Sequence, residues 1–436
     1  MDPNFTAEEE AFRAELRAFL KEELPLEKQM GDLESPQKDG DFEQYFIKRC
    51  AARGWLVPHW PKEYGGLGTT YMQQLIFNEE MAYHRAPVYR SGNGTGLIGP
   101  VIMIYGTDEQ KAEYLPGIAR GETFWAQGFS EPGSGSDLAS LQTRAELQGD
   151  EFVINGGKIW TSAAQYASMA FVLARTDPEA PKHRGISFIL VDMKQPGYEV
   201  RPLIDMAGRH IFNQMFFDNV RAPRKNLVGE MNRGWYIAMA TFSFERSGIE
   251  WPSAGRRMLE ELVEYCKQKD YSGRRPIDDQ IIRQKLADLK IGHEVARRIC
   301  YRVAWQQSQG ELPDANASMT KVFVTELNQR LYRTASEILG MYVNVRWDNE
   351  KHKLLAGRVA RGFLVQPSNT IDAGTSEIMR NVIAGFLRDE NGATAIEYAL
   401  ITALIGTGLI FVLQSLGQTV AGLFTNIGHA LDVLVH

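Results

Sequence analysis

The sequence of 436 residues has few cysteines and no excess of basic residues. Its three cysteines, Cys50, Cys266 and Cys300, lie far apart, which excludes a disulfide framework and a CxxC metal motif, and we predict no metal site. Lysine and arginine number 48 against 54 aspartate and glutamate residues, a net charge of −6. Nucleic acid is not an expected partner, because its binding usually needs a basic surface. The scarcity of cysteine favours a reducing compartment, and we expect a cytoplasmic location for the body of the protein.

The first residues lack the basic start and apolar run of an export signal. They are acidic and amphipathic instead, and Thr6 followed by Glu9 predicts a capping box at the start of a helix. The apolar residues that follow share one helical face: Phe12, Leu16, Phe19 and Leu20. The chain is therefore predicted to begin with a helix that packs on a core.

The body of the chain shows no internal repeat and divides into three zones of different pattern. Residues 1–122 are predicted to form a helical domain, residues 123–235 a β domain, and residues 236–385 a second domain of long helices. Because strands and helices do not alternate, a doubly wound parallel sheet is excluded. The prediction is an α+β fold, followed by a separate apolar helical tail over residues 386–436.

Local patterns support this division. Residues 152–160 form two apolar runs around Asn155-Gly156, which is typical of a β-hairpin with a type I′ turn. Residues 171–175 and 185–192 read as further strands, and residues 284–305 predict a long helix.

Residues 94–99 match the GxGxxG pattern of dinucleotide-binding proteins. That pattern binds a pyrophosphate only between a strand and a helix, and no strand is predicted before it here. We interpret the segment as a loop that connects two helices.

Two short motifs carry the chemistry. Residues 129–137, Phe-Ser-Glu-Pro-Gly-Ser-Gly-Ser-Asp, form a hydroxyl-rich loop whose N–H groups and hydroxyls suit a polar cofactor edge, although a plain surface turn has the same composition. Residues 158–162, Lys-Ile-Trp-Thr-Ser, offer an aromatic plane beside two hydroxyls. Alone, the second motif is also compatible with an ordinary strand end.

In this order and spacing the motifs resemble the acyl-CoA dehydrogenase family of flavoproteins, over residues 1–385. Further motifs of the resemblance lie at residues 60–68, 105–111, 208–235 and 374–381. The family fold is a helical N-terminal domain, a small β-barrel-like middle domain and a C-terminal four-helix bundle, which agrees with the three zones.

The resemblance implies FAD as the cofactor. Its contacts on the first loop are implied to be Gln127, Phe129, Ser130 and Ser136. Trp160 is implied to lie against the flavin and Ser162 to bond near flavin N5; Thr161 is the alternative, because the usual Trp-x-Thr is Trp-Thr-Ser here. The adenine half is implied to reach a neighbouring subunit at five positions: Arg274, Gln280, Gly340, Thr375 and Glu377. Glu337 replaces a family glutamine at a further contact.

The catalytic base is missing from its usual place, where Ala373 stands and Asp372 precedes it. A second arrangement in the family places a glutamate directly before an arginine on a helix, and Glu245-Arg246 matches it. We predict Glu245 as the base and assign substrate contacts to Ser136, Arg246 and the backbone N–H of Ala373. The alternative is that Glu245 is a solvated helix residue.

The predicted function is FAD-dependent dehydrogenation of an acyl-CoA thioester to the trans-2-enoyl-CoA, with electrons passed to an electron-transfer flavoprotein. The base arrangement resembles specialists for long or branched acyl groups and two-subunit enzymes for pimeloyl-CoA or steroid side chains. We expect a homodimer, a homotetramer or a heterotetramer with a related subunit. The alternatives are a flavin oxidase of the same fold, a catalytically silent subunit, and a membrane-anchored structural protein that carries the enzyme body.

The tail resembles a Flp-type (type IVb) pilin precursor. If cleavage follows Gly392, Glu397 and Tyr398 become the fifth and sixth residues of an apolar helix, as in that family. Residues 398–428 contain no charged residue or histidine, which favours a membrane-seeking helix over a buried one. We therefore expect a fusion, with association to the inner membrane through residues 393–428.

Overall fold

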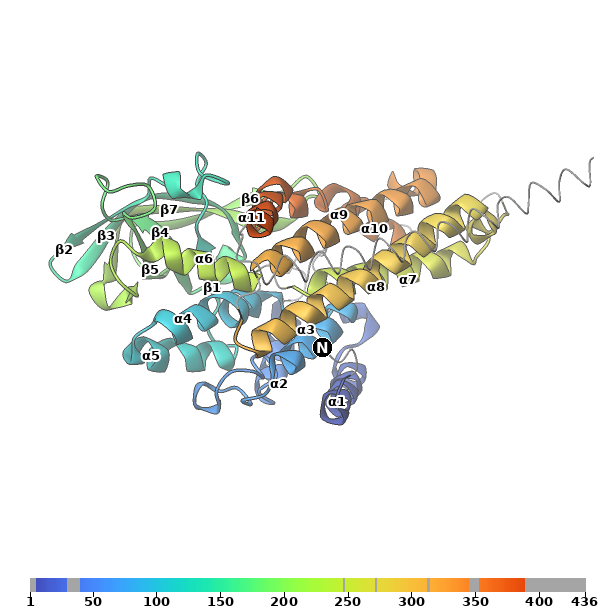
Figure 1. Cartoon of the computed structure of the whole chain (residues 1–436), viewed down its shortest axis with the longest axis horizontal. Coiled ribbons are helices and arrows are strands. Elements are labelled where there is room, and N and C mark those ends of the chain that lie inside the picture. The colour runs from blue at the N-terminus through green and yellow to red at the C-terminus, as the bar shows by residue number, and fades with distance from the viewer. Residues whose placement is uncertain are drawn as a thin grey trace, which may run out of the picture. The chain divides into compact units, whose positions relative to one another are not determined.

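The computed structural model describes residues 5–29, 40–245, 248–270, 273–311, 314–344 and 353–388. The chain divides into two compact units, Met1–Arg380 and Asn381–His436. All described elements belong to the first unit, apart from the C-terminal part of the last helix. The predicted order of helical, β and helical domains is confirmed within the described residues (Figure 1).

The N-terminal domain is helical. Its α-helices are α1 (Ala7–Glu23), α2 (Gly40–Ala51), α3 (Tyr71–Tyr83), α4 (Gly99–Tyr105) and α5 (Asp108–Ala119). The predicted capping box is present, because Thr6 Oγ1 accepts from the Glu9 amide at 3.2 Å and Glu9 Oε2 accepts from the Thr6 amide at 2.8 Å. The four apolar residues predicted for one face of this helix are all buried.

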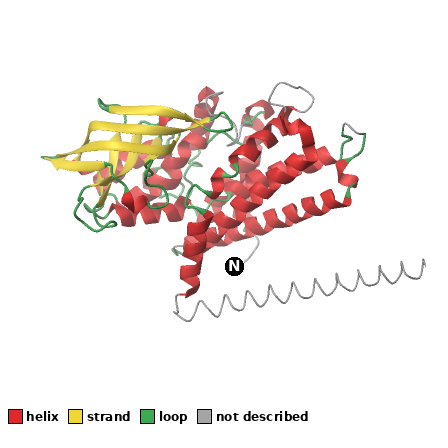
Figure 2. Cartoon of the chain, turned by 90° about the horizontal axis from the view of Figure 1, so that it is seen from above, coloured by secondary structure: helices red, strands yellow, loops and turns green. Residues whose placement is uncertain are grey.

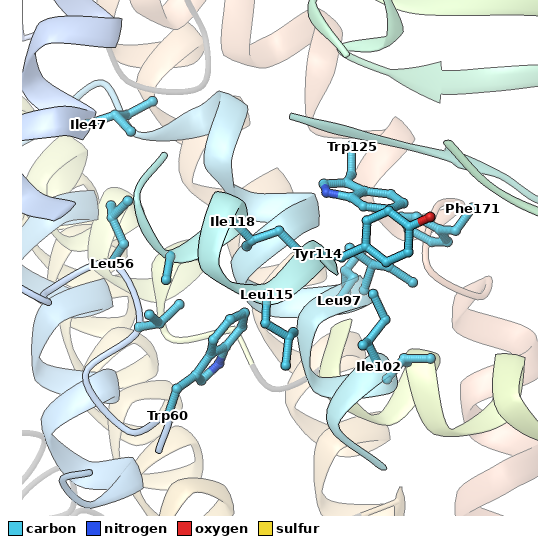
Figure 3. Close-up of a cluster of buried hydrophobic side chains, with 14 of the residues drawn as sticks. Ile47, Leu56, Trp60, Leu97, Ile102, Tyr114, Leu115, Ile118, Trp125 and Phe171 are labelled. Atoms are coloured by element: carbon cyan, nitrogen blue, oxygen red, sulfur yellow. The ribbon is translucent and has the colours of Figure 1, made fainter. Parts of the chain in front are cut away.

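The core of this domain continues into the middle domain. The fully buried Trp60 and Trp125 lie among aliphatic side chains such as Leu97, Leu115 and Ile118 (Figure 3). Trp125 begins the first strand, so the hydrophobic cluster fixes the start of the sheet against α4 and α5.

The GxGxxG segment is helical, which corrects the predicted loop. Residues Asn93–Ile98 form one π-helical stretch that runs directly into α4. At Gly99 a Cβ atom would lie 2.2 Å from the Trp60 ring, so a glycine is required there for packing. The glycine at the end of the pattern therefore allows the helix to pack closely against the Trp60 indole. The segment does not lie between a strand and a helix, as a dinucleotide-binding loop would.

The middle domain contains one eight-stranded sheet (Figure 2). Its strands are β1 (Trp125–Gly128), β2 (Arg144–Gln148), β3 (Glu151–Ser162), β4 (Met169–Arg175), β5 (Ile186–Asp192), β6 (Tyr198–Ile204), β7 (His210–Pro223) and β8 (Leu227–Val228). The order is β6-β7-β3-β2-β4-β5-β8, and β1 pairs in parallel with β4. The strands predicted at 171–175 and 185–192 are confirmed as β4 and β5. Among the described strands β6 and β8 stay at the edges, so the barrel-like sheet is not closed.

The predicted hairpin at Asn155-Gly156 is wrong. β3 runs through both residues, and the turn lies at residues 149–150, where Gln148 pairs with Glu151. Asn155 and Gly156 instead mark a shift of register between β3 and β7, with the Asn155 side-chain oxygen accepting from the Asn219 amide at 2.8 Å. Both a hairpin turn and a bulge tolerate Asn-Gly, which is why the pattern alone was ambiguous.

The C-terminal domain is helical, as predicted. Its helices are α6 (Gly234–Glu245), α7 (Glu250–Cys266), α8 (Gln280–Ser308), α9 (Asp314–Leu339), α10 (Lys353–Val365) and α11 (Ser376–Arg388). The long helix predicted at 284–305 lies within α8. α6 contacts β5, whereas α7 and α8 contact α3 of the N-terminal domain.

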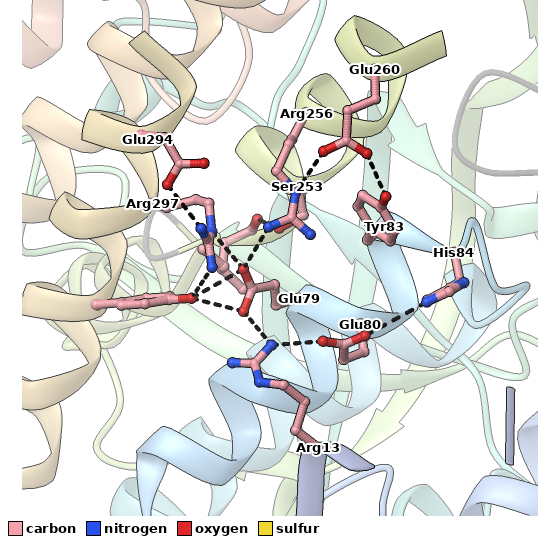
Figure 4. Close-up of polar contacts among 12 residues, drawn as sticks. Arg13, Glu79, Glu80, Tyr83, His84, Ser253, Arg256, Glu260, Glu294 and Arg297 are labelled. Carbon is pink, nitrogen blue, oxygen red and sulfur yellow. Dashed lines mark hydrogen bonds and ion pairs between the residues drawn. The ribbon is translucent and has the colours of Figure 1, made fainter. Parts of the chain in front are cut away.

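A buried network of charges joins the two helical domains (Figure 4). Glu79 of α3, which is not exposed at all, pairs with Arg13 at 2.8 Å and with Arg297 of α8 at 2.7 Å. Burial alone would raise the pKa of the neighbouring Glu80, but hydrogen bonds from His84, Arg17 and Arg13 together lower it to about 2. Because each buried charge has an opposite partner, the network holds α3 against α8 without a net penalty from unpaired charge.

Candidate active site

The hydroxyl-rich loop at 129–137 is held by a buried ion pair. Glu131 accepts from the Lys158 ammonium at 2.8 Å and from the backbone N–H groups of Gln142 and Thr143 at 2.7 and 2.9 Å. Lys158 of β3 is completely buried and also donates to the Phe129 carbonyl at 3.0 Å. Burial lowers the pKa of Lys158 to about 8, although Glu131 opposes the shift. The pair therefore fixes the loop against β3.

The predicted flavin contacts of this loop differ in environment. Gln127 lies on β1, and its buried Nε2 has no hydrogen-bond partner among the described residues. Phe129 is buried and its ring meets Phe171 and Phe188 edge-on. Ser130 is half-buried and Ser136 exposed. The orphaned amide of Gln127 is the kind of donor that a bound polar cofactor would satisfy.

The second motif lies beside the first. The Ile159 amide donates to the Ser130 carbonyl at 2.9 Å, so the end of β3 lies along the loop. Trp160 has a backbone φ of 61° at a bulge and is 60% exposed, so its indole turns away from the core. Thr161 is buried and its Oγ1 lacks a partner among the described groups. The exposed aromatic plane and the two orphaned donors, on Thr161 and Gln127, fit a flat, polar ring system such as a flavin.

A cavity of about 530 Å³ adjoins the end of β3. It lies between α3, the segment from Arg85 to Pro100 and the start of α7. Ser162 lines it, as do Asn93 and Gly96 of the π-helical stretch. Its volume falls within the range of ligand pockets, roughly 300–1,000 Å³.

The arginines of the cavity wall are neutralised by carboxylates. Arg90 pairs with the buried Glu43 at 2.9 Å, and its guanidinium lies over the Tyr166 ring. Arg85 makes two hydrogen bonds to Glu261, at 2.7 and 2.8 Å. The wall therefore presents arginine side chains without presenting free positive charge.

The predicted base lies at the border of the described region. Glu245 is the last residue of α6, but its side chain and the whole of Arg246 lie outside the described residues. The next described residues, Gly248, Ile249 and Glu250, line the cavity. The described residues that follow Glu245-Arg246 in the sequence therefore lie on the cavity wall.

The usual position of the base is a half-buried turn, in which Ala373 has a φ of 48°. Although part of the neighbouring Asp372 is exposed, burial raises the pKa of its carboxyl group to about 6, and the charge of Lys321 opposes the shift. The buried Lys321 of α9 donates to the Gly374 carbonyl at 2.7 Å and holds this turn in place. Neither Asp372 nor Ala373 is among the residues that line the cavity.

The five residues predicted for the adenine half do not join the cavity either. Arg274, Gln280, Gly340 and Glu377 are exposed and Thr375 is half-exposed. Arg274 and Gln280 flank the start of α8, whereas Thr375 and Glu377 stand at the start of α11. Glu337, the residue in place of the family glutamine, pairs with Lys285 at 2.6 Å.

Sequence reasoning missed the Glu131–Lys158 pair and Glu250. A signal was present for the first, since Lys158 interrupts an apolar strand at a position that β3 buries. A lysine is almost never fully buried without a partner, and the motif loop offers two acidic candidates, Glu131 and Asp137.

Comparison with known proteins agrees with this arrangement. Residues 6–122, 126–220 and 232–387 match the N-terminal, middle and C-terminal domains of acyl-CoA dehydrogenases, and residues 386–431 match the Flp/Fap pilin component. Acyl-CoA dehydrogenase FadE26 of Mycobacterium tuberculosis is 38% identical over 391 residues, which cover 87% of this chain and 96% of the relative.

Solved structures show the same fold. The Tcur3481-Tcur3483 steroid ACAD is similar with a TM-score of 0.78 and 34% identity, covering 88% of this chain and 98% of that one. The ChsE4-ChsE5 complex from Mycobacterium tuberculosis gives a TM-score of 0.77 and 37% identity, with coverage of 88% and 98%. The chain therefore belongs to the acyl-CoA dehydrogenase family of oxidoreductases, with a C-terminal segment that matches the Flp/Fap pilins.

Proposed function

We propose that the protein is an FAD-dependent enzyme that converts an acyl-CoA thioester to the trans-2-enoyl-CoA. The observation that carries this proposal is that one cavity is lined by Ser162, the predicted flavin contact, and by Gly248, which follows the predicted base closely in the sequence. A proton acceptor and a hydride acceptor must face the same substrate, and a shared cavity meets that requirement.

The residues of the chain have distinct proposed roles. Bound FAD would supply the acceptor for the hydride that leaves the β-carbon. Glu245 would take the proton from the α-carbon, so that the electron pair of that C–H bond forms the new double bond. Gln127 and Thr161 would hydrogen-bond the flavin, and Trp160 would cover it. Ser136 and Arg246 would contact the substrate. The Ala373 N–H would hold the thioester oxygen, a role that rests on the family resemblance because Ala373 does not line the cavity.

For the substrate we propose a bulky or branched acyl group. The name of one similar structure, the Tcur3481-Tcur3483 steroid ACAD, refers to a steroid enzyme, and the cavity of this chain measures about 530 Å³. Gly96 lines the cavity and a Cβ atom there would meet nothing within 4 Å, so the wall is recessed at this point. The recess therefore favours a wide acyl group over a straight, narrow acyl chain.

For the assembly we propose a homo-oligomer or a heterotetramer with a related subunit. The exposure of Arg274, Gln280, Gly340 and Glu377 supports a role across a subunit interface, because residues that serve a neighbour must lie at the surface. We further propose that α7, α8, α9 and α10 act as a four-helix bundle in this assembly; α8 contacts α7 and α9, and α9 contacts α10. Electrons would pass to an electron-transfer flavoprotein.

The test is anaerobic reduction of the bound flavin by a panel of acyl-CoAs. We expect purified protein to be yellow with one FAD per chain, and its visible flavin absorbance to bleach with at least one acyl-CoA. Colourless protein that cannot be reconstituted with FAD would contradict the proposal. Rapid oxygen consumption with substrate would favour the oxidase instead.

For the tail we propose association with the inner membrane through residues 393–428, while the body stays in the cytoplasm. No helix in the described residues is long and apolar enough to cross a bilayer, and residues 389–436 lie outside that part of the chain. The support is therefore the pilin match and the uncharged run of the sequence. The three cysteines of the body are buried and unpaired, in keeping with a reducing compartment.

A chain truncated after Arg388 tests this proposal. We expect it to fold, bind FAD and keep its specific activity, because the acyl-CoA dehydrogenase match ends at residue 387. The full-length chain should partition to membranes or need detergent, since about 20 apolar residues suffice to span a bilayer. Sedimentation and specific activity of the two chains are compared. A soluble, monodisperse full-length protein together with an inactive truncated one would show that the tail is part of the enzyme fold.

A further inference from the structure

Glu250 is the one carboxyl group of the cavity wall that has no basic partner among the described residues. The other ionisable wall residues are accounted for: Arg90 pairs with Glu43, Arg85 with Glu261, and His59 hydrogen-bonds Gln74 at 2.9 Å. Arg358 also lies 3.6 Å from Glu261. Glu250, the first residue of α7, bonds only its own backbone N–H.

The surroundings of this carboxyl group are apolar. Leu75 of α3, Ile249 immediately before α7, and Cys300 and Ala304 of α8 belong to one buried cluster, and Leu75, Ile249 and Ala304 also line the cavity. Gly248 leaves room for the carboxyl, because a Cβ atom there would lie 2.9 Å from Glu250 Oε2. Burial raises the pKa of Glu250, with its own backbone N–H opposing the shift, and so favours the neutral acid.

The nearby polar groups do not satisfy it. The Gln74 side-chain amide donates to Asn78 Oδ1 at 2.9 Å, and its oxygen accepts from His59 Nδ1 at 2.9 Å. These polar groups therefore already have partners. The Thr95 hydroxyl donates to the Ser91 carbonyl at 3.1 Å on the other side of the cavity. Glu250 is half-buried and lines the cavity, so its carboxyl group is within reach of a bound ligand. A few well-placed polar groups in a largely apolar pocket commonly fix the orientation of the ligand.

We propose that Glu250 recognises a hydroxyl group on the acyl group of the substrate, remote from the thioester. A carboxyl group can accept a hydrogen bond from a hydroxyl, and a neutral one can also donate to it. A cationic acyl group is disfavoured because burying a charge beside the apolar cluster of Leu75, Ile249, Cys300 and Ala304 is costly. An acyl carboxylate is disfavoured because the arginines of the cavity wall already have carboxylate partners. This inference rests on the proposed function, and it adds a hydroxyl group to the bulky acyl substrate proposed above.

The experiment compares acyl-CoAs of matched length with and without an ω-hydroxyl group. Non-oxidisable thioether analogues of each pair give the dissociation constant by calorimetry, and the acyl-CoAs themselves give the rate of anaerobic flavin reduction. We expect wild-type protein to bind at least one hydroxylated analogue about tenfold more tightly than its plain counterpart. Glu250→Met should abolish this preference, whereas Glu250→Gln should keep most of it, because an amide can still donate and accept.

Thr95→Val is the matched control, since it removes a polar group of the same wall that is already satisfied; the preference should change by less than about twofold. A wild-type protein without preference for any hydroxylated analogue would overturn the proposal, as would a preference that survives Glu250→Met. If Glu250→Gln instead stops flavin reduction by every acyl-CoA while binding persists, Glu250 is the base and not a specificity residue. Failure of the proposed function looks different, because then no acyl-CoA bleaches the flavin of the wild-type protein.

Discussion

Glu245→Gln is expected to retain the fold and the flavin and to lose flavin reduction by acyl-CoA by about 10²- to 10⁴-fold, the usual contribution of a positioned proton acceptor. The amide has nearly the same size as the carboxylate but cannot take the α-proton. The rate is measured by anaerobic stopped-flow absorbance with saturating substrate, and substrate binding is measured separately with a non-oxidisable analogue. A loss in rate with little change in binding identifies a group that acts in the chemical step.

Asp372→Asn and Glu250→Gln are the matched controls, because these are the other carboxyl groups that compete for the role. Asp372 is exposed on the turn before Ala373 and does not line the cavity, so its replacement should leave the rate within a few-fold of wild type. If Asp372→Asn stops the reaction and Glu245→Gln does not, the base has been assigned to the wrong residue.

Local signals in the sequence predicted local structure well. The capping box at Thr6 and the long helix within α8 depend on residues a few positions apart, and both are confirmed. The order of the three domains is also confirmed, because it follows from the change in hydrophobic period along the chain. The error at Asn155-Gly156 has a clear cause: the bulge there depends on Asn219 of β7, which no local pattern reveals.

The site itself depends mainly on contacts between distant segments. Glu131 and Lys158 are 27 positions apart, and Glu79 reaches Arg297 across 218 positions. The sequence also does not reveal that Glu250 has no basic partner among the described residues. That result depends on the fold, in which Arg85 and Arg358 lie beside Glu261 and Arg90 pairs with Glu43. The order of the motifs in the sequence indicated the family. Which carboxyl groups form ion pairs, and which can act on a substrate, depends on contacts that exist only in the folded protein.

Lys158→Met is expected to destabilise the protein by about 3–5 kcal/mol and to cause loss of FAD during purification. The substitution leaves the Glu131 carboxylate buried without its cation, and removes the donor that ties the Phe129 carbonyl to β3. Because the loop that Glu131 organises carries the predicted flavin contacts, loosening it should weaken cofactor binding as well as folding. Urea unfolding gives the change in free energy of unfolding, and the ratio of flavin to protein absorbance gives the FAD content.

Two further variants test whether the expected effect comes from the buried Glu131–Lys158 pair or from any change of charge at the loop. Lys182→Met breaks an exposed ion pair of the same loop, with Asp137 at 2.5 Å, and should change neither stability nor FAD content measurably. The double variant Glu131→Gln with Lys158→Met removes both buried charges and keeps an oxygen to accept from the amides of Gln142 or Thr143. It should be more stable than Lys158→Met alone, because an unpaired buried charge costs more than a missing pair. A double variant as unstable as the single one would mean that the lysine contributes through its contact with the Phe129 carbonyl and not through Glu131.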